Sequence, residues 1–385
     1  MTQVIFTERC DYMKVIAAID SFKGSMTSME AGNAVKKGIL AAKPDAEVVV
    51  NPLADGGEGT VDALIEGLGA KKIPVTVTGP LGEKVSCYYG FLEETKSAVM
   101  EMASAAGITL VTKKDPLRAS TYGVGEMIAD ALKRGCKNFI IGIGGSATND
   151  GGIGMLKALG FEFFDEDGND VGEGAAALAK IEVIQTENKN PLLSGAKFQI
   201  ACDVKNPLCG KQGATYIFGP QKGVTEEQKS KVDEAMKHYA DVTKESLGCD
   251  FADCEGAGAA GGLGYAFLSY LAGELIPGVE LILQATGLEE KMKNADVVVT
   301  GEGRLDAQTV MGKAPVGVAA LAKKYNAKVI AFAGSVAPEA SVCNQAGIDA
   351  FFPIVRGVTT LEEAMKKENA MENIAATAEQ VFRLL

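Results

Sequence analysis

The chain has 385 residues, of which 47% are hydrophobic and 23% charged, a balance typical of a soluble globular protein with two domains. Its formal net charge of −12 argues against nucleic-acid binding, which needs a basic face, and its longest weakly polar run is too interrupted by Glu and Pro to span a membrane. Eight cysteines without a CxxC pair, and an N-terminus without signal-peptide features, predict a cytoplasmic protein with reduced thiols.

The first predicted strand follows a polar stretch, residues 1–12, which we interpret as an extension outside the fold. Val15–Ile19 is apolar and β-prone, and a helix over Ser28–Ala42 comes after it because Thr27 and Glu30 have capping-box spacing. The strand ends in polar residues, among them Asp20, Ser21 and Lys23. Ligands bind at this end of strands in open α/β sheets, so these three residues are site candidates.

The same pattern follows once more: Glu47–Asn51 is a predicted strand, and the helix after it runs through Leu68. The turn between them is rich in glycine and carries two acids, Asp55 and Glu58. Two such turns in the first sixty or so residues indicate a parallel α/β unit.

The pattern changes near Lys71, where strict alternation of apolar residues around Gly79–Gly82 predicts an antiparallel hairpin up to Phe91. We therefore place a domain boundary after residue 67. Ser120–Gly135 has one apolar face and is predicted to be a helix.

The most informative stretch is Phe139–Gly154, which reads FIIGIGGSATNDGGIG. An apolar strand leads into a glycine loop and then a short apolar helix that stops at Gly160. Glycines allow close approach of the backbone to a ligand, and a helix start favours an anion. Because Asp150 would repel a bare phosphate at that point, we expect a cation there as well, and a nucleotide with Mg²⁺ fits both requirements.

Further along, Gln199–Val204 is a predicted strand that ends in Asp203, which can serve a metal, a hydroxyl or a structural turn. A helix capped by Thr225 runs to about Leu247, and Gly256–Gly264 opens another predicted helix, Tyr265–Leu275. A single histidine, His238, lies in the first of these helices, so catalysis through a histidine base or a histidine metal site is disfavoured.

The last part returns to apolar strands that alternate with helices. Ala295–Thr300 is a strand followed by Glu302, Arg304 and Asp306, with Lys313 before the next helix. Two more strands, Lys328–Ala333 and Ala350–Val355, and a final helix Leu361–Leu384 complete the chain. Continuous apolar strands indicate a parallel sheet covered on both faces.

The fold prediction is therefore two α/β domains. Residues 13–67 and 288–385 form a doubly wound, Rossmann- or flavodoxin-like domain, and residues 68–287 form an inserted mixed α/β domain. A P-loop is absent from the sequence. Gly142, Gly144 and Ala147 match the GxGxxG/A pattern, but the acid in the same loop favours a metal nucleotide over NAD.

Several stretches together resemble the glycerate kinase family of bacterial type. The matching segments, in chain order from residue 13, are AAIDSFKGSMTS, ADGGEGTVDAL, STYGVGEMI, GIGGSATNDGGIGMLKALG, CDVKNPLCG, GAGAAGGLGYA, LIPGVELIL and TGEGRLDAQTVMGKAP. The resemblance implies ATP-dependent phosphorylation of D-glycerate with Mg²⁺, in an interdomain cleft of a two-domain protein. It also implies 2-phosphoglycerate as the usual product, with 3-phosphoglycerate as the alternative. For the oligomeric state we expect a monomer or a homodimer, and the sequence does not decide between them.

Roles within such a site follow from phosphoryl-transfer chemistry, which needs charge neutralisation, alignment and a proton acceptor. The expected catalytic residues are Asp20, Lys23, Asp306 and Arg304. The expected ATP- and phosphate-binding residues are Gly144, Gly145, Ser146, Thr148, Asn149, Gly151, Gly152 and Lys313. The expected substrate-binding residues are Ser21, Asp55, Glu58 and Arg304, and the expected Mg²⁺ ligands are Asp150, Asp203 and Glu302. Two alternatives stay open: an NAD-dependent dehydrogenase of small hydroxy acids, and a non-catalytic sugar-acid sensor.

Overall fold

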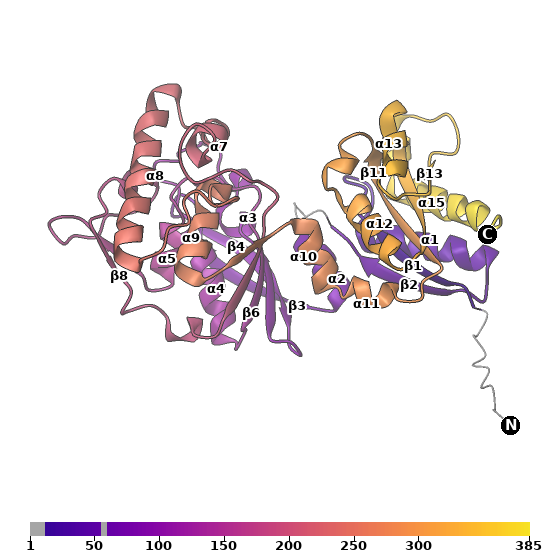
Figure 1. Cartoon of the computed structure of the whole chain (residues 1–385), viewed down its shortest axis with the longest axis horizontal. Coiled ribbons are helices and arrows are strands. Elements are labelled where there is room, and N and C mark those ends of the chain that lie inside the picture. The colour runs from indigo at the N-terminus through magenta and orange to yellow at the C-terminus, as the bar shows by residue number, and fades with distance from the viewer. Residues whose placement is uncertain (1–11, 55–59) are drawn as a thin grey trace. The chain divides into compact units, whose positions relative to one another are not determined.

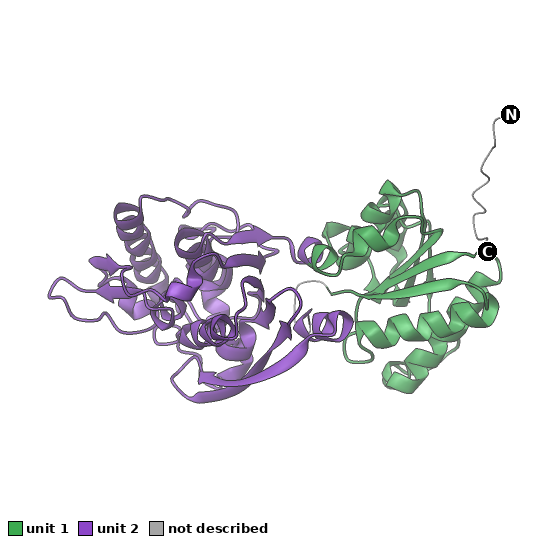
Figure 2. Ribbon diagram, turned by 90° about the horizontal axis from the view of Figure 1, so that it is seen from below, with its two compact units in different colours: residues 1–55, 282–385 green, residues 56–281 purple. Residues whose placement is uncertain are grey.

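The computed structural model describes residues 12–54 and 60–385 and divides the chain into two compact units. Unit 1 comprises Met1–Asp55 and Ile282–Leu385, and unit 2 comprises Gly56–Leu281 (Figure 2). Both are built of α-helices and β-strands, which confirms the predicted fold class. None of the described helices is long and apolar enough to cross a membrane.

A five-stranded parallel sheet forms the centre of unit 1 (Figure 1). Its strands, in spatial order, are β2 (Glu47–Pro52), β1 (Lys14–Ile19), β11 (Val297–Leu305), β12 (Lys328–Val336) and β13 (Ala350–Pro353). Counted within the unit, this order is 2-1-3-4-5, the flavodoxin-like arrangement, with the whole of unit 2 inserted between the second and third strands. The strand order reverses between β1 and β11, which is where such sheets bind ligands.

Helices α1 and α15 pack side by side on this sheet. The predicted capping box is present: Glu30 N donates to Thr27 Oγ1 and Thr27 N donates to Glu30 Oε2, at the start of the predicted helix. Gly38 explains how closely the two helices approach, since a Cβ there would lie 2.0 Å from the Ala375 carbonyl oxygen. The helices of unit 1 are α1 (Ser28–Ala42), α11 (Leu288–Met292), α12 (Ala314–Lys324), α13 (Val342–Gln345), α14 (Leu361–Met365) and α15 (Lys367–Phe382), with 3₁₀ turns at Thr309–Met311 and Pro338–Ser341.

Two predictions in this unit need correction. The predicted final helix is two helices, because Lys366 has an extended ψ of 128° that breaks the run between α14 and α15. Strand β11 is longer than predicted, because pairing with β12 continues through Arg304 and Leu305. Glu302 and Arg304 therefore lie two residues apart on a strand, on the same side of it, and not in a loop.

A six-stranded mixed sheet forms the centre of unit 2. Its order is β10 (Glu274–Ile276), β9 (Lys197–Ala201), β6 (Asn138–Gly142), β5 (Ser97–Glu101), β4 (Lys84–Leu92) and β3 (Lys71–Thr78). The predicted hairpin is β3–β4, paired antiparallel with Val75 opposite Cys87, while β5, β6, β9 and β10 run parallel. Strands β7 (Glu162–Phe164) and β8 (Val183–Gln185) form a separate antiparallel pair.

The helices of unit 2 are α2 (Thr60–Leu68), α3 (Ala103–Ala106), α4 (Tyr122–Lys133), α5 (Ile153–Ala158), α6 (Ala175–Leu178), α7 (Ala214–Lys222), α8 (Glu226–Leu247) and α9 (Leu263–Leu271), and α10 (Gly278–Ala285) crosses the boundary with unit 1. Short 3₁₀ turns lie at Ile108–Leu110, Pro191–Leu193 and Ala259–Gly261. The predicted helix Tyr265–Leu275 ends early, because Ala272 takes a left-handed φ of 49° and the next residues pair with β9 as β10.

The division of the chain differs by one helix from the predicted boundary after residue 67. Helix α2 packs against β4 and β5 of unit 2. Gly90 on β4 makes room for Ile65, whose Cγ1 would lie 2.6 Å from a Cβ at that glycine. Asp62 also accepts hydrogen bonds from Lys72 and Tyr88 on the hairpin.

Candidate active site

Unit 1 contains a cavity of about 400 Å³ at the carboxyl ends of its strands. Residues from the ends of β1, β11, β12 and β13 line it, which is the arrangement that a parallel sheet imposes. Six of the predicted site residues contribute to its wall: Asp20, Ser21, Lys23, Glu302, Arg304 and Lys313. The other end of the cavity is apolar and includes Ile354, Leu361 and Met365.

Arg304 and Lys313 of the cavity wall form long ion pairs with nearby acids. Lys313 Nζ is 3.7 Å from Glu302 Oε2 and 3.9 Å from Asp306 Oδ1, and Arg304 Nε is 3.6 Å from Asp306 Oδ2. Glu302 Oε1 accepts a 2.6 Å hydrogen bond from Thr309 Oγ1. Ion pairs of this length, whose cations are partly exposed, contribute little to folding stability, and the cations can turn to an anionic ligand.

Asp20 is the most buried acid of the unit 1 cavity, with 5% of its surface exposed. Its backbone is fixed by a 2.9 Å hydrogen bond from Asp20 N to the Gly301 carbonyl, between the two strands at the switch point. Asp20 Oδ1 accepts a 2.7 Å hydrogen bond from Ser21 N. The carboxylate is therefore anchored at a cavity wall that Glu302 and Arg304 also line.

Unit 2 contains a second cavity, of about 390 Å³, beside the glycine loop after β6. Gly144, Gly145 and Ser146 line it, together with Asp203 at the end of β9. Gly144 has no positive φ, and a Cβ added to it would meet no atom within 4 Å. Neither backbone conformation nor packing thus requires a glycine at this position, and the predicted ligand contact at Gly144 stays a prediction.

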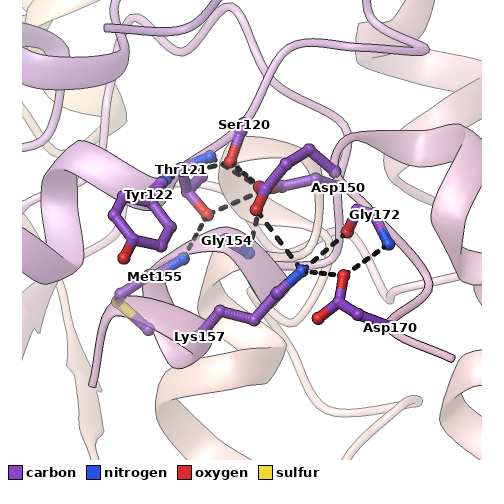
Figure 3. Close-up of polar contacts among 10 residues, drawn as sticks. Ser120, Thr121, Tyr122, Asp150, Gly154, Met155, Lys157, Asp170 and Gly172 are labelled. Atoms are coloured by element: carbon purple, nitrogen blue, oxygen red, sulfur yellow. Dashed lines mark hydrogen bonds and ion pairs between the residues drawn. The ribbon is translucent and has the colours of Figure 1, made fainter. Parts of the chain in front are cut away.

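Asp150, at the end of the glycine loop, lies in a buried hydrogen-bond network within the protein (Figure 3). Asp150 has no exposed surface, and its carboxylate accepts hydrogen bonds from Thr121 N and Oγ1, both at 2.8 Å, and from the N–H groups of Gly152 and Gly154. Burial raises the pKa of Asp150, and the hydrogen bonds from Thr121 and Gly152 oppose that change. Asp150 thus caps α5, whose first N–H groups are occupied from inside the chain.

These contacts change how the loop is interpreted. Gly151 N donates to the Gly261 carbonyl, and Gly152 N donates to Asp150, so neither N–H group points to a ligand. The sequence-based prediction that Asp150, Gly151 and Gly152 bind metal or phosphate gains no support from this geometry and stays a prediction.

Two neighbouring residues of the loop keep unused polar atoms. Asn149 Nδ2 donates to Thr215 Oγ1 at 3.0 Å, but Asn149 Oδ1 and Thr148 Oγ1 are buried without a hydrogen-bond partner. Of the other predicted site residues, Asp203 is exposed and accepts a hydrogen bond from Gly278 N, while Asp55 and Glu58 lie outside the described residues.

The structure adds a residue that sequence reasoning missed. Lys222, the last residue of α7, is buried and lines the unit 2 cavity. Its local sequence gives no signal, because a lysine before a glycine at a helix end is ordinary. Burial is visible only in three dimensions.

Among the described residues there is no cluster of three or more His, Cys, Asp or Glu that could hold a metal ion by itself. The predicted ligands Asp150 and Asp203 belong to unit 2, and Glu302 belongs to unit 1. Single carboxylates of this kind suit Mg²⁺ that is held mainly by substrate phosphates and water.

The chain is similar to known proteins over nearly its whole length. The sequence model described as the glycerate kinase family matches residues 15–385. The chain is 46% identical over 371 residues to a protein named glycerate kinase from Bacillus subtilis (strain 168), covering 96% of this chain and 97% of that one. It is 45% identical over 372 residues to one named glycerate 2-kinase from Escherichia coli (strain K12), covering 95% and 98%.

The fold has a similar counterpart among solved structures. A crystal structure described as a "putative glycerate kinase 2" from Salmonella typhimurium LT2 has a TM-score of 0.89 and 43% identity, and the match covers 97% of this chain and 98% of that one.

Proposed function

The chain belongs to the glycerate kinase family, and from this we propose that it transfers the γ-phosphoryl group of ATP to a hydroxyl of D-glycerate. The 2-hydroxyl is the proposed acceptor, which gives 2-phosphoglycerate, because the relative from E. coli is named a glycerate 2-kinase. This assignment makes the protein an enzyme and selects the kinase from the three functions considered from the sequence.

The observation that carries the proposal is the charged cavity at the strand ends of unit 1. Lys23, Arg304 and Lys313 are three cations on its wall, and phosphoryl transfer depends on neutralising charge and aligning the reactants. We assign Arg304 to the glycerate carboxylate, because its planar fork can bind both carboxylate oxygens. Lys23 and Lys313 are assigned to phosphate oxygens.

Asp20 is the proposed acceptor of the hydroxyl proton. It lines the cavity, is nearly buried and is fixed by its backbone hydrogen bond to Gly301. In the reaction, the glycerate oxygen forms a bond to the γ-phosphorus while the bond from that phosphorus to the bridging oxygen of ADP breaks. The hydroxyl proton passes to the Asp20 carboxylate, and ADP leaves with its negative charge.

Oxygen ligands for Mg²⁺ are present in both units, and the donor chemistry fits this ion. Glu302 and Asp203 line cavities and are the better candidates, since the carboxylate of Asp150 already accepts four hydrogen bonds. When bound, Mg²⁺ would neutralise charge on the ATP phosphates. Gly144, Gly145 and Ser146 are the part of the glycine loop that we assign to ligand contact.

A coupled assay for ADP release tests the proposal directly. We expect ADP to form from ATP with D-glycerate, but not with L-glycerate and not without an acceptor. Phosphorus NMR of the product then identifies the phosphorylated hydroxyl. Binding of glycerate without ADP formation would leave only the sensor function, and an NAD-dependent absorbance change without a need for Mg²⁺ would favour the dehydrogenase.

A further inference from the structure

Lys222 is a buried lysine that the proposed reaction does not yet use. Only 2% of its surface is exposed, and its Nζ donates to Ser146 Oγ at 2.6 Å and to the Thr148 carbonyl at 2.7 Å. Both partners belong to the glycine loop, so α7 is tied through this side chain to the stretch that follows β6. The same residue lines the unit 2 cavity beside Gly144 and Gly145.

Its charge has no close counter-ion in the described part of the chain. No carboxylate there forms an ion pair with Lys222; Asp150 acts on it only through its charge, with both oxygens already hydrogen-bonded to Thr121, Gly152 and Gly154. Burying an ammonium group without a paired anion is costly. That cost lowers the pKa of Lys222 to about 7.

A lysine is a poor choice if this position only fills space, because methionine or glutamine would occupy a similar volume without the charge. An ammonium group has three N–H donors, and the two hydrogen bonds to the loop use two of them. An anion in the cavity would take the third and neutralise the buried charge. Gly144 is consistent with this, since the space beside it is open.

We propose that Lys222 is a ligand-binding residue whose ammonium group pairs with an oxyanion bound in the unit 2 cavity, either a phosphate of ATP or the carboxylate of glycerate. The two ligands come from the proposed function, on which this inference rests. Ser146 and Thr148 are the groups that hold the ammonium in place for this contact.

Calorimetric titration of the full-length enzyme with each ligand tests the proposal, using Mg²⁺-ATP without glycerate and D-glycerate without ATP. We expect Lys222→Met to weaken binding of one ligand at least tenfold and to leave the other within about twofold. Loss in the ATP titration identifies a phosphate as the anion, and loss in the glycerate titration identifies the carboxylate. Lys222→Arg, which keeps the charge, should recover part of the affinity for the same ligand.

Unchanged affinity for both ligands would overturn the proposal. Equal weakening of both would overturn it as well, because it would mean that Lys222 only stabilises the glycine loop. Lys231→Met, an exposed lysine on α8, is the matched control and should bind both ligands as the wild type does. If the methionine variant does not fold, Lys222→Gln carries the same test, since it keeps a donor for the Thr148 carbonyl. Wild-type protein is assayed first: absence of glycerate phosphorylation there would refute the proposed function, whereas active wild type with unaltered variants refutes this inference alone.

Discussion

The segments that line the strand-end cavity of unit 1 resemble the glycine loop of unit 2 in residue types, but their acidic side chains are placed differently. Both follow an apolar strand, and both combine glycines with acidic residues. In unit 1, Arg304 and Lys313 lie on the cavity wall in loose ion pairs of 3.6 to 3.9 Å. In unit 2, Asp150 is fully buried and accepts four hydrogen bonds from its own chain.

The comparison shows that an acidic residue in a glycine-rich segment can have either of two roles. It can face a ligand, or it can hold together the loop that does so. Burial and hydrogen-bond partners separate the two cases, and residue type does not. The comparison makes distinct predictions for the two regions, because stability and activity should respond in opposite ways.

The largest effect is expected from Asp150→Ala. It would leave up to four buried donors without an acceptor, and we expect the free energy of unfolding of unit 2 to fall by about 4 kcal/mol or more. Urea denaturation followed by far-ultraviolet circular dichroism measures this. Asp203→Ala, at an exposed acid that lines the unit 2 cavity, is the control and should lose about 1 kcal/mol or less. An Asp150 variant with wild-type stability and no activity would place this acid among the ligand-binding residues.

The opposite result is expected for Arg304→Ala. Its side chain is 66% exposed, so we expect the free energy of unfolding to change by less than about 0.5 kcal/mol. Loss of the carboxylate contact should lower kcat/KM for D-glycerate about 100-fold, equivalent to about 3 kcal/mol. Steady-state kinetics measure the effect. Arg383→Ala is the control, at an exposed arginine directly after α15 that is paired with Glu379. This variant should keep full activity, and an equal loss there would contradict the assigned role of Arg304.

Two glycines of unit 2 sharpen the same comparison within one region. Gly261 has a φ of +71°, and a Cβ there would lie 2.2 Å from the Thr148 carbonyl oxygen, so Gly261→Ala should lower the free energy of unfolding by about 2 kcal/mol or more. Gly144→Ala meets open space and should cost less than about 1 kcal/mol while lowering kcat/KM about tenfold. Thermal unfolding and steady-state rates distinguish them, and a fully active Gly144→Ala enzyme would exclude close ligand approach at that loop.

Sequence reasoning succeeded where local signals determine structure. The capping boxes at Thr27 and Thr225 and the alternation in the β3–β4 hairpin predicted their elements almost to the residue, since each depends on neighbours a few positions apart. Side chains at the carboxyl ends of parallel strands could be predicted to share one edge. This is why Asp20 and Arg304 were both site candidates.

It failed where tertiary contacts override local preference. Glu274–Ile276 follows an apolar helix, and only pairing with β9 makes it a strand. The capping role of Asp150 depends on Thr121, 29 residues earlier, and the burial of Lys222 depends on a loop 74 to 76 residues earlier. Residues so far apart in sequence cannot be recognised as partners from a local sequence pattern.

The buried charge of Lys222 in unit 2 should also make stability depend on pH. The pKa of Lys222 is about 7 in the folded protein against an ordinary 10.5, because burial disfavours its charge more than the nearby Asp150 favours it. Between these values the unfolded chain binds more protons than the folded one, so stability rises with pH and the penalty of the buried charge is fully present only below about pH 7. In the absence of ligands, we expect the wild-type free energy of unfolding to rise relative to that of Lys222→Met between pH 7.5 and 9.5. The expected rise is on the order of 1 kcal/mol per pH unit. Denaturation of the wild type and of Lys222→Met across this pH range measures the difference between their free energies of unfolding. Groups that titrate alike in both proteins do not contribute to this difference. Parallel curves would mean that the charged form of Lys222 is not disfavoured in the folded protein.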